Sequence, residues 1–233
     1  MRFIDTVDGL NNIFSSDIPK GSIVLVTGSA GSLKSGFTFA MMSNYLENTD
    51  EYGVYITLEQ NKESHLANMT NMGINISDRL LISDYSNYRL QFGDESADIF
   101  EIITTNILQY KKKMGDKFTC LVIDSLGALY TLMDLDPSEI RKRLYYLFEP
   151  LRREGLTTFA IFETENVIGD SIPMGGVEGY LADGIIELGI QTTEQTSKRY
   201  IKVKKMRASS HSMDPWILTI SDNGLKIYKN PSI

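Results

Sequence analysis

The sequence predicts an α/β fold with one mostly parallel central sheet, helices on both of its faces and an antiparallel extension toward the carboxyl end. Short, nearly continuous apolar runs alternate with longer segments in which apolar residues recur at helical spacing. A loop of glycine, serine and alanine joins the first strong apolar run to the helix that follows it. Beyond Asp183 this alternation stops, and extended segments follow one another directly.

The alternating part of the chain begins with a strand and ends with a strand. Strands are predicted at residues 22–27, 54–57, 80–82, 120–123 and 157–162, and helices at 34–48, 62–72, 96–113 and 137–153. The last helix has a clear start, because Asp136 is a typical cap and Pro137 suits the first helical position. Gly155 ends it.

The carboxyl-terminal extension consists of extended segments at residues 185–190, 199–205, 216–221 and 225–228. The Asn-Gly pair at 223–224 favours a hairpin between the last two. The sequence contains no internal repeat and no proline-rich linker, and 233 residues are enough for one α/β domain. We therefore expect residues 1–233 to form a single domain.

Composition narrows the class of protein further. Hydrophobic residues make up 42% and charged residues 23% of the chain, which is typical of globular domains. The single cysteine, Cys120, lies in an apolar run and is expected to be buried, and it can form no disulfide within the chain. The sequence has neither a signal-peptide pattern nor an apolar stretch of 18 residues, so we expect a cytoplasmic protein without a membrane span. The net charge of −7 disfavours a dedicated duplex-DNA binder.

The loop after the first strand has the pattern of a phosphate-binding Walker A loop. A loop between a strand and a helix presents backbone N–H groups and a helix amino terminus to phosphates. Lys34 is placed to reach the β- and γ-phosphates, and the Ser35 hydroxyl to bind Mg²⁺. The predicted nucleotide-binding residues are Gly28, Ser29, Ala30, Gly31, Ser32, Leu33, Lys34, Ser35 and Gly36.

One position of this loop departs from the pattern G-x-x-x-x-G-K-[ST]. Leu33 stands where the second signature glycine belongs. If that position needs a positive φ, an L-residue there costs about 1–2 kcal/mol. A chance glycine-serine turn is the alternative interpretation of the loop.

Two acidic residues at strand ends complete the candidate site. Asp124 ends an apolar strand in the manner of a Walker B aspartate, which holds Mg²⁺ beside the hydroxyl of the phosphate loop. Glu59 follows the strand at 54–57, where open α/β sheets place their ligands, and is a candidate to activate the attacking water. Gln60 either orients that water or is an ordinary loop residue.

With these motifs in place, the chain resembles the KaiC-like and RadA-like ATPases of the RecA superfamily, as a single KaiC domain covering residues 8–227. The segment Lys205-Met206-Arg207-Ala208-Ser209-Ser210-His211 is similar to the family's K-x-R-x-[ST]-x-H segment. Val177-Glu178 and the residues from Ala182 to Ile186 are similar to another family block. The family commonly has two adjacent glutamates where this chain has Glu59-Gln60.

The resemblance implies a P-loop ATPase fold, ATP and Mg²⁺ as ligands, and a homo-oligomeric ring, usually a hexamer. In relatives the basic segment reaches the γ-phosphate bound by the neighbouring subunit, which implies such contacts for Lys205, Arg207 and His211 here. The loop at residues 166–176 occupies the place where related rings line their channel. It contains Asp170 and no lysine or arginine, so it lacks a cationic groove for single-stranded DNA, and nucleic acid is an unfavoured partner.

Three hypotheses about function remain open from the sequence. The first is a slow Mg²⁺-dependent ATP hydrolase that acts in signalling or regulation. The second is a non-hydrolysing ATP sensor or scaffold that recruits a protein partner, as the replacements Leu33 and Gln60 suggest. The third is a paralogue of the RadA recombinases that acts in DNA repair, which rests on fold analogy alone.

Overall fold

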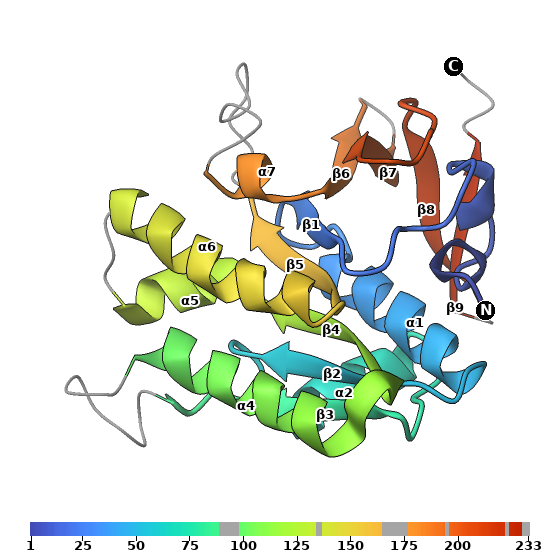
Figure 1. The fold of residues 1–233 in the computed structure, drawn as a ribbon. Coiled ribbons are helices and arrows are strands. Elements are labelled where there is room, and N and C mark those ends of the chain that lie inside the picture. The colour runs from blue at the N-terminus through green and yellow to red at the C-terminus, as the bar shows by residue number, and fades with distance from the viewer. Residues whose placement is uncertain (89–97, 134–136, 165–176, 194–195, 222–223, 230–233) are drawn as a thin grey trace.

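The computed structural model describes residues 1–88, 98–133, 137–164, 177–193, 196–221 and 224–229. It confirms the predicted fold class, with nine strands in one sheet of order β3-β2-β4-β5-β1-β6-β7-β8-β9 (Figure 1). The strands are β1 (Ile23–Gly28), β2 (Tyr52–Thr57), β3 (Leu80–Asp84), β4 (Phe118–Asp124), β5 (Thr157–Glu163), β6 (Gly184–Thr192), β7 (Ser197–Met206), β8 (Trp216–Ser221) and β9 (Gly224–Lys229).

The sheet is parallel from β3 to β6 and antiparallel from there on. Strand β1 pairs in parallel with both β5 and β6, whereas β7, β8 and β9 each run opposite to the strand before them. The first strand of the predicted extension, β6, is therefore still a parallel partner of β1. Strands β8 and β9 pair up to Ser221 and Gly224, as expected of the predicted hairpin.

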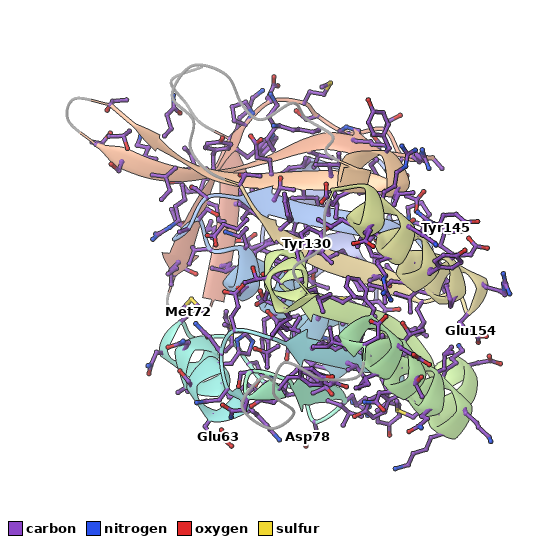
Figure 2. All side chains as sticks on the ribbon, turned by 90° about the vertical axis from the view of Figure 1, so that its left-hand side faces the viewer. Glu63, Met72, Asp78, Tyr130, Tyr145 and Glu154 are labelled. Carbon is purple, nitrogen blue, oxygen red and sulfur yellow. The ribbon has the colours of Figure 1, made fainter. Side chains whose placement is uncertain are left out.

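Helices cover both faces of the sheet. They are α1 (Lys34–Glu47), α2 (Lys62–Asn71), α4 (Ile99–Met114), α5 (Leu126–Met133), α6 (Pro137–Arg153) and α7 (Val177–Leu181). In Figure 1, α4, α5 and α6 lie together on one side of the strands and α1 on the other. Helix α6 begins at Pro137 as predicted, and it buries Leu144, Leu147 and Phe148 while Tyr145 on its outer side is 50% exposed (Figure 2).

The parallel strands are buried on both faces, which accounts for their nearly continuous apolar runs. Successive residues of β1 alternate between two cores, with Val24 and Val26 in the core under α1 and Ile23 and Leu25 in the core under α4, α5 and α6. Cys120 of β4 is fully buried in the first of these cores, as predicted.

The structure adds elements that the sequence pattern did not predict. Helices α5 and α7 were missed, and so were the short helical turns at Phe3–Asp5, Leu10–Asn12 and Gly115–Lys117. The amino-terminal turns lie beside β9, where Ile227 N donates to Asp8 O (2.8 Å). The cap predicted at Asp136 and the loop predicted at 166–176 lie outside the described residues. Within the described part of the chain, no helix has the length and apolar character needed to cross a bilayer.

Candidate functional site

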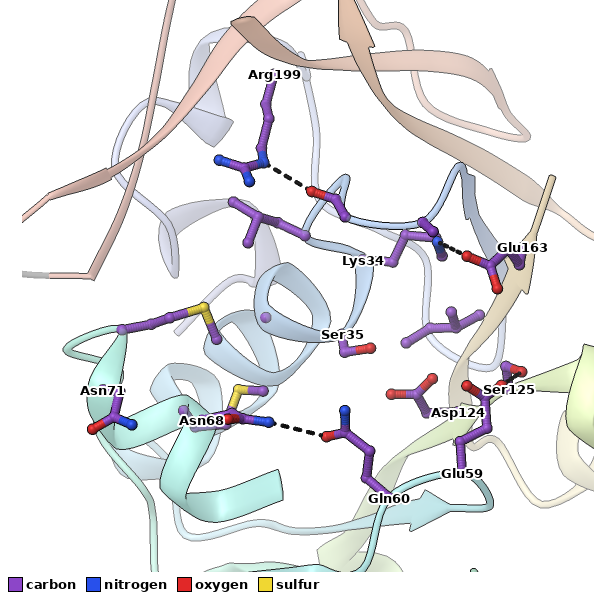
Figure 3. A pocket seen from close by; sticks show the side chains of 17 residues that line it. Lys34, Ser35, Glu59, Gln60, Asn68, Asn71, Asp124, Ser125, Glu163 and Arg199 are labelled. Carbon is purple, nitrogen blue, oxygen red and sulfur yellow. Dashed lines mark hydrogen bonds and ion pairs between the residues drawn. The ribbon is translucent and has the colours of Figure 1, made fainter. Parts of the chain in front are cut away.

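One cavity of about 670 Å³ is lined by many of the predicted site residues, although Gly28, Ser29 and Ser32 of the predicted loop are not in its lining. It lies at the carboxyl ends of β1, β2, β4 and β5, the edge at which parallel sheets bind their ligands. Figure 3 shows this cavity from close by. Its lining includes Lys34, Ser35, Glu59, Gln60 and Asp124, together with Asn68, Asn71, Met72, Ser125, Glu163 and Arg199.

The predicted phosphate loop has a left-handed residue at the position of its second signature glycine. Leu33 adopts a left-handed φ of 72° at the cap of α1, so the missing glycine does fall at a position of positive φ. That conformation costs an L-residue about 1–2 kcal/mol. The Leu33 side chain packs against the buried core, which offsets part of this cost. Gly28, by contrast, has no room for a side chain, because a Cβ there would lie 1.8 Å from Leu188 O.

Lys34 is buried beside the loop that precedes it. Its Nζ donates to Ser29 O (2.8 Å) and lies 3.4 Å from Glu163 Oε1. The Lys34 side chain is 10% exposed, so its charge acts in a site that is poorly screened by water. The ammonium is therefore held at the mouth of the loop, in the position from which it can meet a phosphate (Figure 3).

Asp124 is a buried carboxylate held by a tyrosine of the neighbouring strand. The Tyr55 hydroxyl donates to Asp124 Oδ2 (2.6 Å). Burial raises the pKa of the Asp124 carboxyl, and hydrogen bonds from Tyr55 and Ser35 oppose that rise. The Ser35 hydroxyl and the Asp124 carboxylate thus lie next to each other in the cavity, as two oxygen groups of the kind that Mg²⁺ prefers (Figure 3).

The ring of Tyr55 packs in a cluster with the rings of Phe39 and His65. Its ring lies 4.6 Å from the His65 ring of α2 and 5.5 Å from the Phe39 ring of α1, measured between centroids. Tyr55 and Phe39 are fully buried, and His65 is 1% exposed. This packing leaves the Tyr55 side chain little freedom, so the orientation of Asp124 is set by residues outside the cavity.

Glu59 and Gln60 lie at the open side of the cavity and are exposed to solvent. The Ser125 hydroxyl makes a short hydrogen bond to Glu59 Oε1, which fixes one oxygen of that carboxylate. The side-chain oxygen of Gln60 accepts from Asn68 Nδ2 (3.3 Å). The structure therefore brings Glu59 to the same cavity as Lys34 and Asp124, whereas the Gln60 side chain is engaged with α2 (Figure 3).

Several residues of the site were not assigned from the sequence, among them Glu163, Arg199 and Tyr55. Glu163 ends β5 beside Lys34, and it could have been found by the same strand-end rule that located Asp124, because β5 runs one residue further than predicted. Arg199 of β7 donates from Nε to Gly31 O (2.9 Å), a contact across the sheet that has no local signal. The contact of the Tyr55 hydroxyl with Asp124 has no local sequence signal either.

Lys205, Arg207 and His211 do not join this cavity. Arg207 forms an ion pair with Asp183 (2.9 Å), and Asp183 also accepts from Ile23 N (3.0 Å) at the start of β1. Lys205 Nζ donates to Gly179 O and Ala182 O, and burial lowers the pKa of this amine. Strand β1 rises about 16 Å from Ile23 to Gly28, so the Arg207–Asp183 ion pair lies at the end of this strand opposite the predicted phosphate loop.

His211 is separate from the pair as well. Its Nδ1 lies 3.2 Å from Ser209 O, and its ring lies 6.3 Å from the ring of Phe14 in the amino-terminal segment. None of the three residues of the basic segment lines the cavity around Lys34. One subunit by itself does not unite the two sets.

The set of donors in the cavity fits nucleotide chemistry. A buried lysine and the amino terminus of α1 attract phosphate oxygens, and a hydroxyl paired with a carboxylate suits Mg²⁺. In the part of the chain that the structure describes, no group of three or more His, Cys, Asp or Glu side chains could hold a metal ion by itself. Magnesium usually takes one or two carboxylates and completes its shell with phosphates and water.

Comparison with known proteins points the same way. The family model described as "ATPase: KaiC" matches residues 5–232. The circadian clock oscillator protein KaiC of Prochlorococcus marinus strain MIT 9313 is 24% identical over 231 residues, which cover 95% of this chain and 45% of that protein. The circadian clock protein KaiC2 of Synechocystis sp. is 25% identical over 227 residues, which cover 95% and 39%.

A solved structure matches over the full length of both chains. The KaiC-like protein of the hyperthermophilic archaeon Pyrococcus horikoshii OT3 is 25% identical and has a TM-score of 0.79, covering 98% of this chain and 99% of that chain. This chain spans less than half the length of the two cyanobacterial relatives, at 45% and 39%.

Proposed function

This chain belongs to the KaiC family of ATPases, and on that premise we propose that it binds Mg·ATP in the cavity around Lys34 and hydrolyses it slowly as a ring of identical subunits. The observation that carries the proposal is the convergence of Lys34, Ser35, Glu59 and Asp124 on one cavity. These residues come from three different strand ends, so only the fold brings them together. A chance glycine-serine turn would have no reason to meet a buried carboxylate and a second acid.

Each residue has a distinct part in the proposed reaction. Lys34 and the N–H groups of the phosphate loop bind the β- and γ-phosphates. Ser35 and Asp124 would hold Mg²⁺, which offsets the negative charge of the phosphate oxygens. Glu59 accepts a proton from, or orients, the attacking water, and its bond to Ser125 holds the carboxylate for that task. Tyr55 keeps Asp124 in place.

The active site is proposed to be complete only between subunits. Lys205 and Arg207 lie at the amino-terminal end of β1, whereas the phosphate loop follows its carboxyl-terminal end. Within one chain they therefore do not reach a nucleotide bound at Lys34. A neighbouring subunit in a ring can present them to it instead, with His211 following on the same segment. A cation supplied in this way is worth about 10³–10⁵ in rate where it meets the charge of the transition state.

Two replacements favour slow turnover. Leu33 has a positive φ, a conformation that is strained for leucine but that glycine adopts without strain. Gln60 supplies an amide where the family commonly has a second acid, and this amide is bonded to Asn68. Neither replacement removes Lys34, Ser35 or Asp124. Slow hydrolysis suits a regulatory switch in the cytoplasm that recruits a protein partner while ATP is bound.

Phosphate release from the purified protein with Mg·ATP tests the proposal. Lys34→Ala should abolish release and nucleotide binding, because the phosphates lose their cation. Glu59→Gln should lower release at least tenfold while binding persists. Glu149→Gln is the matched control, because it removes one acid from the outer part of α6, away from the cavity. Release that is unchanged in both the Lys34 and Glu59 variants would refute the assignment.

Mixed oligomers test the sharing of sites. Lys34→Ala chains keep the basic segment, and Arg207→Ala chains keep the phosphate loop. We expect neither variant to hydrolyse ATP alone and a co-assembled mixture to recover part of the activity. No recovery in a mixture shown to co-assemble by mass would contradict the shared site.

A second candidate is a non-hydrolysing ATP sensor, which the engagement of Gln60 with Asn68 favours. The same assays separate the two candidates. Tight ATP binding and ATP-dependent assembly without phosphate release above background would select the sensor.

A further inference from the structure

Glu163 is the one acid in the cavity that pairs with Lys34 among the described residues. Strands β1 and β5 are paired so that Glu163 lies opposite Gly28, the first residue of the phosphate loop. The backbone N–H of Thr164 donates to Gly28 O (3.0 Å) and ties the end of β5 to that loop. The position of the carboxylate beside the loop is thus built into the sheet.

The Lys34 ammonium has a limited number of donors to share. Of its three N–H groups, one points to Ser29 O (2.8 Å) and one to Glu163 Oε1 (3.4 Å). Any phosphate that binds Lys34 therefore competes with Glu163 for the same charge. The Lys34 side chain is 10% exposed and the Glu163 side chain is 51% exposed, so solvent and salt screen part of this competition.

Glu163 approaches Lys34 from one side. Strand β5 lies between β4 and β1, so Glu163 stands on the side of Asp124 and Ser125, while Asn71 lies on the opposite side of the cavity (Figure 3). In the binding mode proposed above, the terminal phosphate of the nucleotide lies on the side of Asp124 and Glu59, the candidate metal ligand and the candidate base. We therefore expect the Glu163 carboxylate to lie nearer to the γ-phosphate than to the β-phosphate of a nucleotide bound in this way.

We infer that Glu163 is a specificity-determining residue that lowers the affinity for nucleoside triphosphates relative to diphosphates. It does so by competing for Lys34 and by placing a negative charge beside the γ-phosphate. This inference rests on the proposed nucleotide binding. The nucleotide-free site and the site with bound diphosphate are therefore favoured until a further cation offsets the charge of Glu163. The basic segment of a neighbouring subunit can supply that cation.

A different role for Glu163 would give a different result. If its carboxylate served as a second general base, its removal would slow phosphate release and leave the relative affinities unchanged. The competition predicts a changed ratio of affinities even when no chemistry takes place. Binding measurements without turnover therefore separate the two roles.

The test compares the dissociation constants of ADP and of a non-hydrolysable imido triphosphate, both with Mg²⁺, for the full chain. Glu163→Gln should bind the triphosphate about three- to tenfold more tightly, and ADP less than about twofold more tightly. Glu163→Asp keeps the charge and should return toward the wild-type ratio. Glu149→Gln, which also removes one acid, should leave the ratio unchanged. The gain in Glu163→Gln should shrink as salt is raised.

If the affinity for the triphosphate relative to that for ADP is unchanged or lower in Glu163→Gln, the inference is overturned while the proposed function stays intact. Loss of binding for both nucleotides in this variant would also overturn it, because the carboxylate would then be needed rather than competing. If the wild-type protein binds neither nucleotide, the proposed function and this inference fail together.

Discussion

Acid should destabilise the protein through His65, a buried imidazole that packs against Tyr55. His65 is 1% exposed, and its Nε2 has no hydrogen-bond partner among the residues that the structure describes. Burial lowers its pKa from 6.5 to about 4. The folded protein therefore binds a proton at this ring only below about pH 4, whereas the unfolded chain binds one below about pH 6.5.

The sign and size of the effect follow from these two values. The stability that neutral His65 contributes is fully present above pH 6.5 and is lost progressively as the pH falls to about 4. The gap between the two pKa values corresponds to about 3 kcal/mol in the free energy of unfolding, of which about 2 kcal/mol is lost by pH 5. Replacement by leucine, which cannot be protonated, should remove this loss.

Urea unfolding followed by circular dichroism at pH 7, 6 and 5 measures the effect. The free energy of wild type minus that of His65→Leu should fall by about 2 kcal/mol between pH 7 and pH 5. His211→Gln, which removes the other histidine of the chain, is the control. All proteins are compared at one concentration, because oligomerisation alters apparent stability. Parallel pH profiles for wild type and His65→Leu would refute the reasoning.

Three further results are expected from buried or close-packed groups. Tyr55→Phe removes the hydrogen bond to Asp124 and should weaken Mg²⁺ binding to the nucleotide complex about 10–100-fold. The affinity for nucleotide in EDTA should stay unchanged. An unchanged Mg²⁺ dissociation constant in a titration of this variant would contradict the positioning role. Burial raises the pKa of Cys120 well above its usual range, so iodoacetamide should modify this thiol only after unfolding, which mass spectrometry detects. Gly28→Ala would place a Cβ 1.8 Å from Leu188 O, and a thermal melt should show a loss of about 3 kcal/mol or more.

Some parts of the site follow a rule that sequence reading can apply. Asp124 and Glu59 were located because a charged residue at the end of an apolar strand falls at the ligand-binding edge of a parallel sheet. Glu163 obeys the same rule, but its strand was ended one residue early. Helix α5 was missed because Leu126–Met133 is a short apolar run, and such runs have no periodicity that separates a buried helix from a strand.

Other contacts had no signal in the chain. Tyr55 and Asp124 are 69 residues apart, and Arg199 and Gly31 are 168 apart, so only the order of strands in the sheet joins them. The pairing of β6 with β1 is of the same kind. A side-chain period reports which face is buried, but it does not report which strand lies next to it.

The alternation of strands and helices, the predicted phosphate loop with Lys34 and Ser35, and the acids Asp124 and Glu59 could all be recognised in the sequence alone. Each of these is local, since it depends on residues within one element or one turn. Three contacts became visible only in the tertiary structure. Tyr55 holds Asp124, Glu163 pairs with Lys34, and Arg207 pairs with Asp183 at the amino-terminal end of β1. Those facts depend on strand order and register, which arise from packing both faces of the sheet at once.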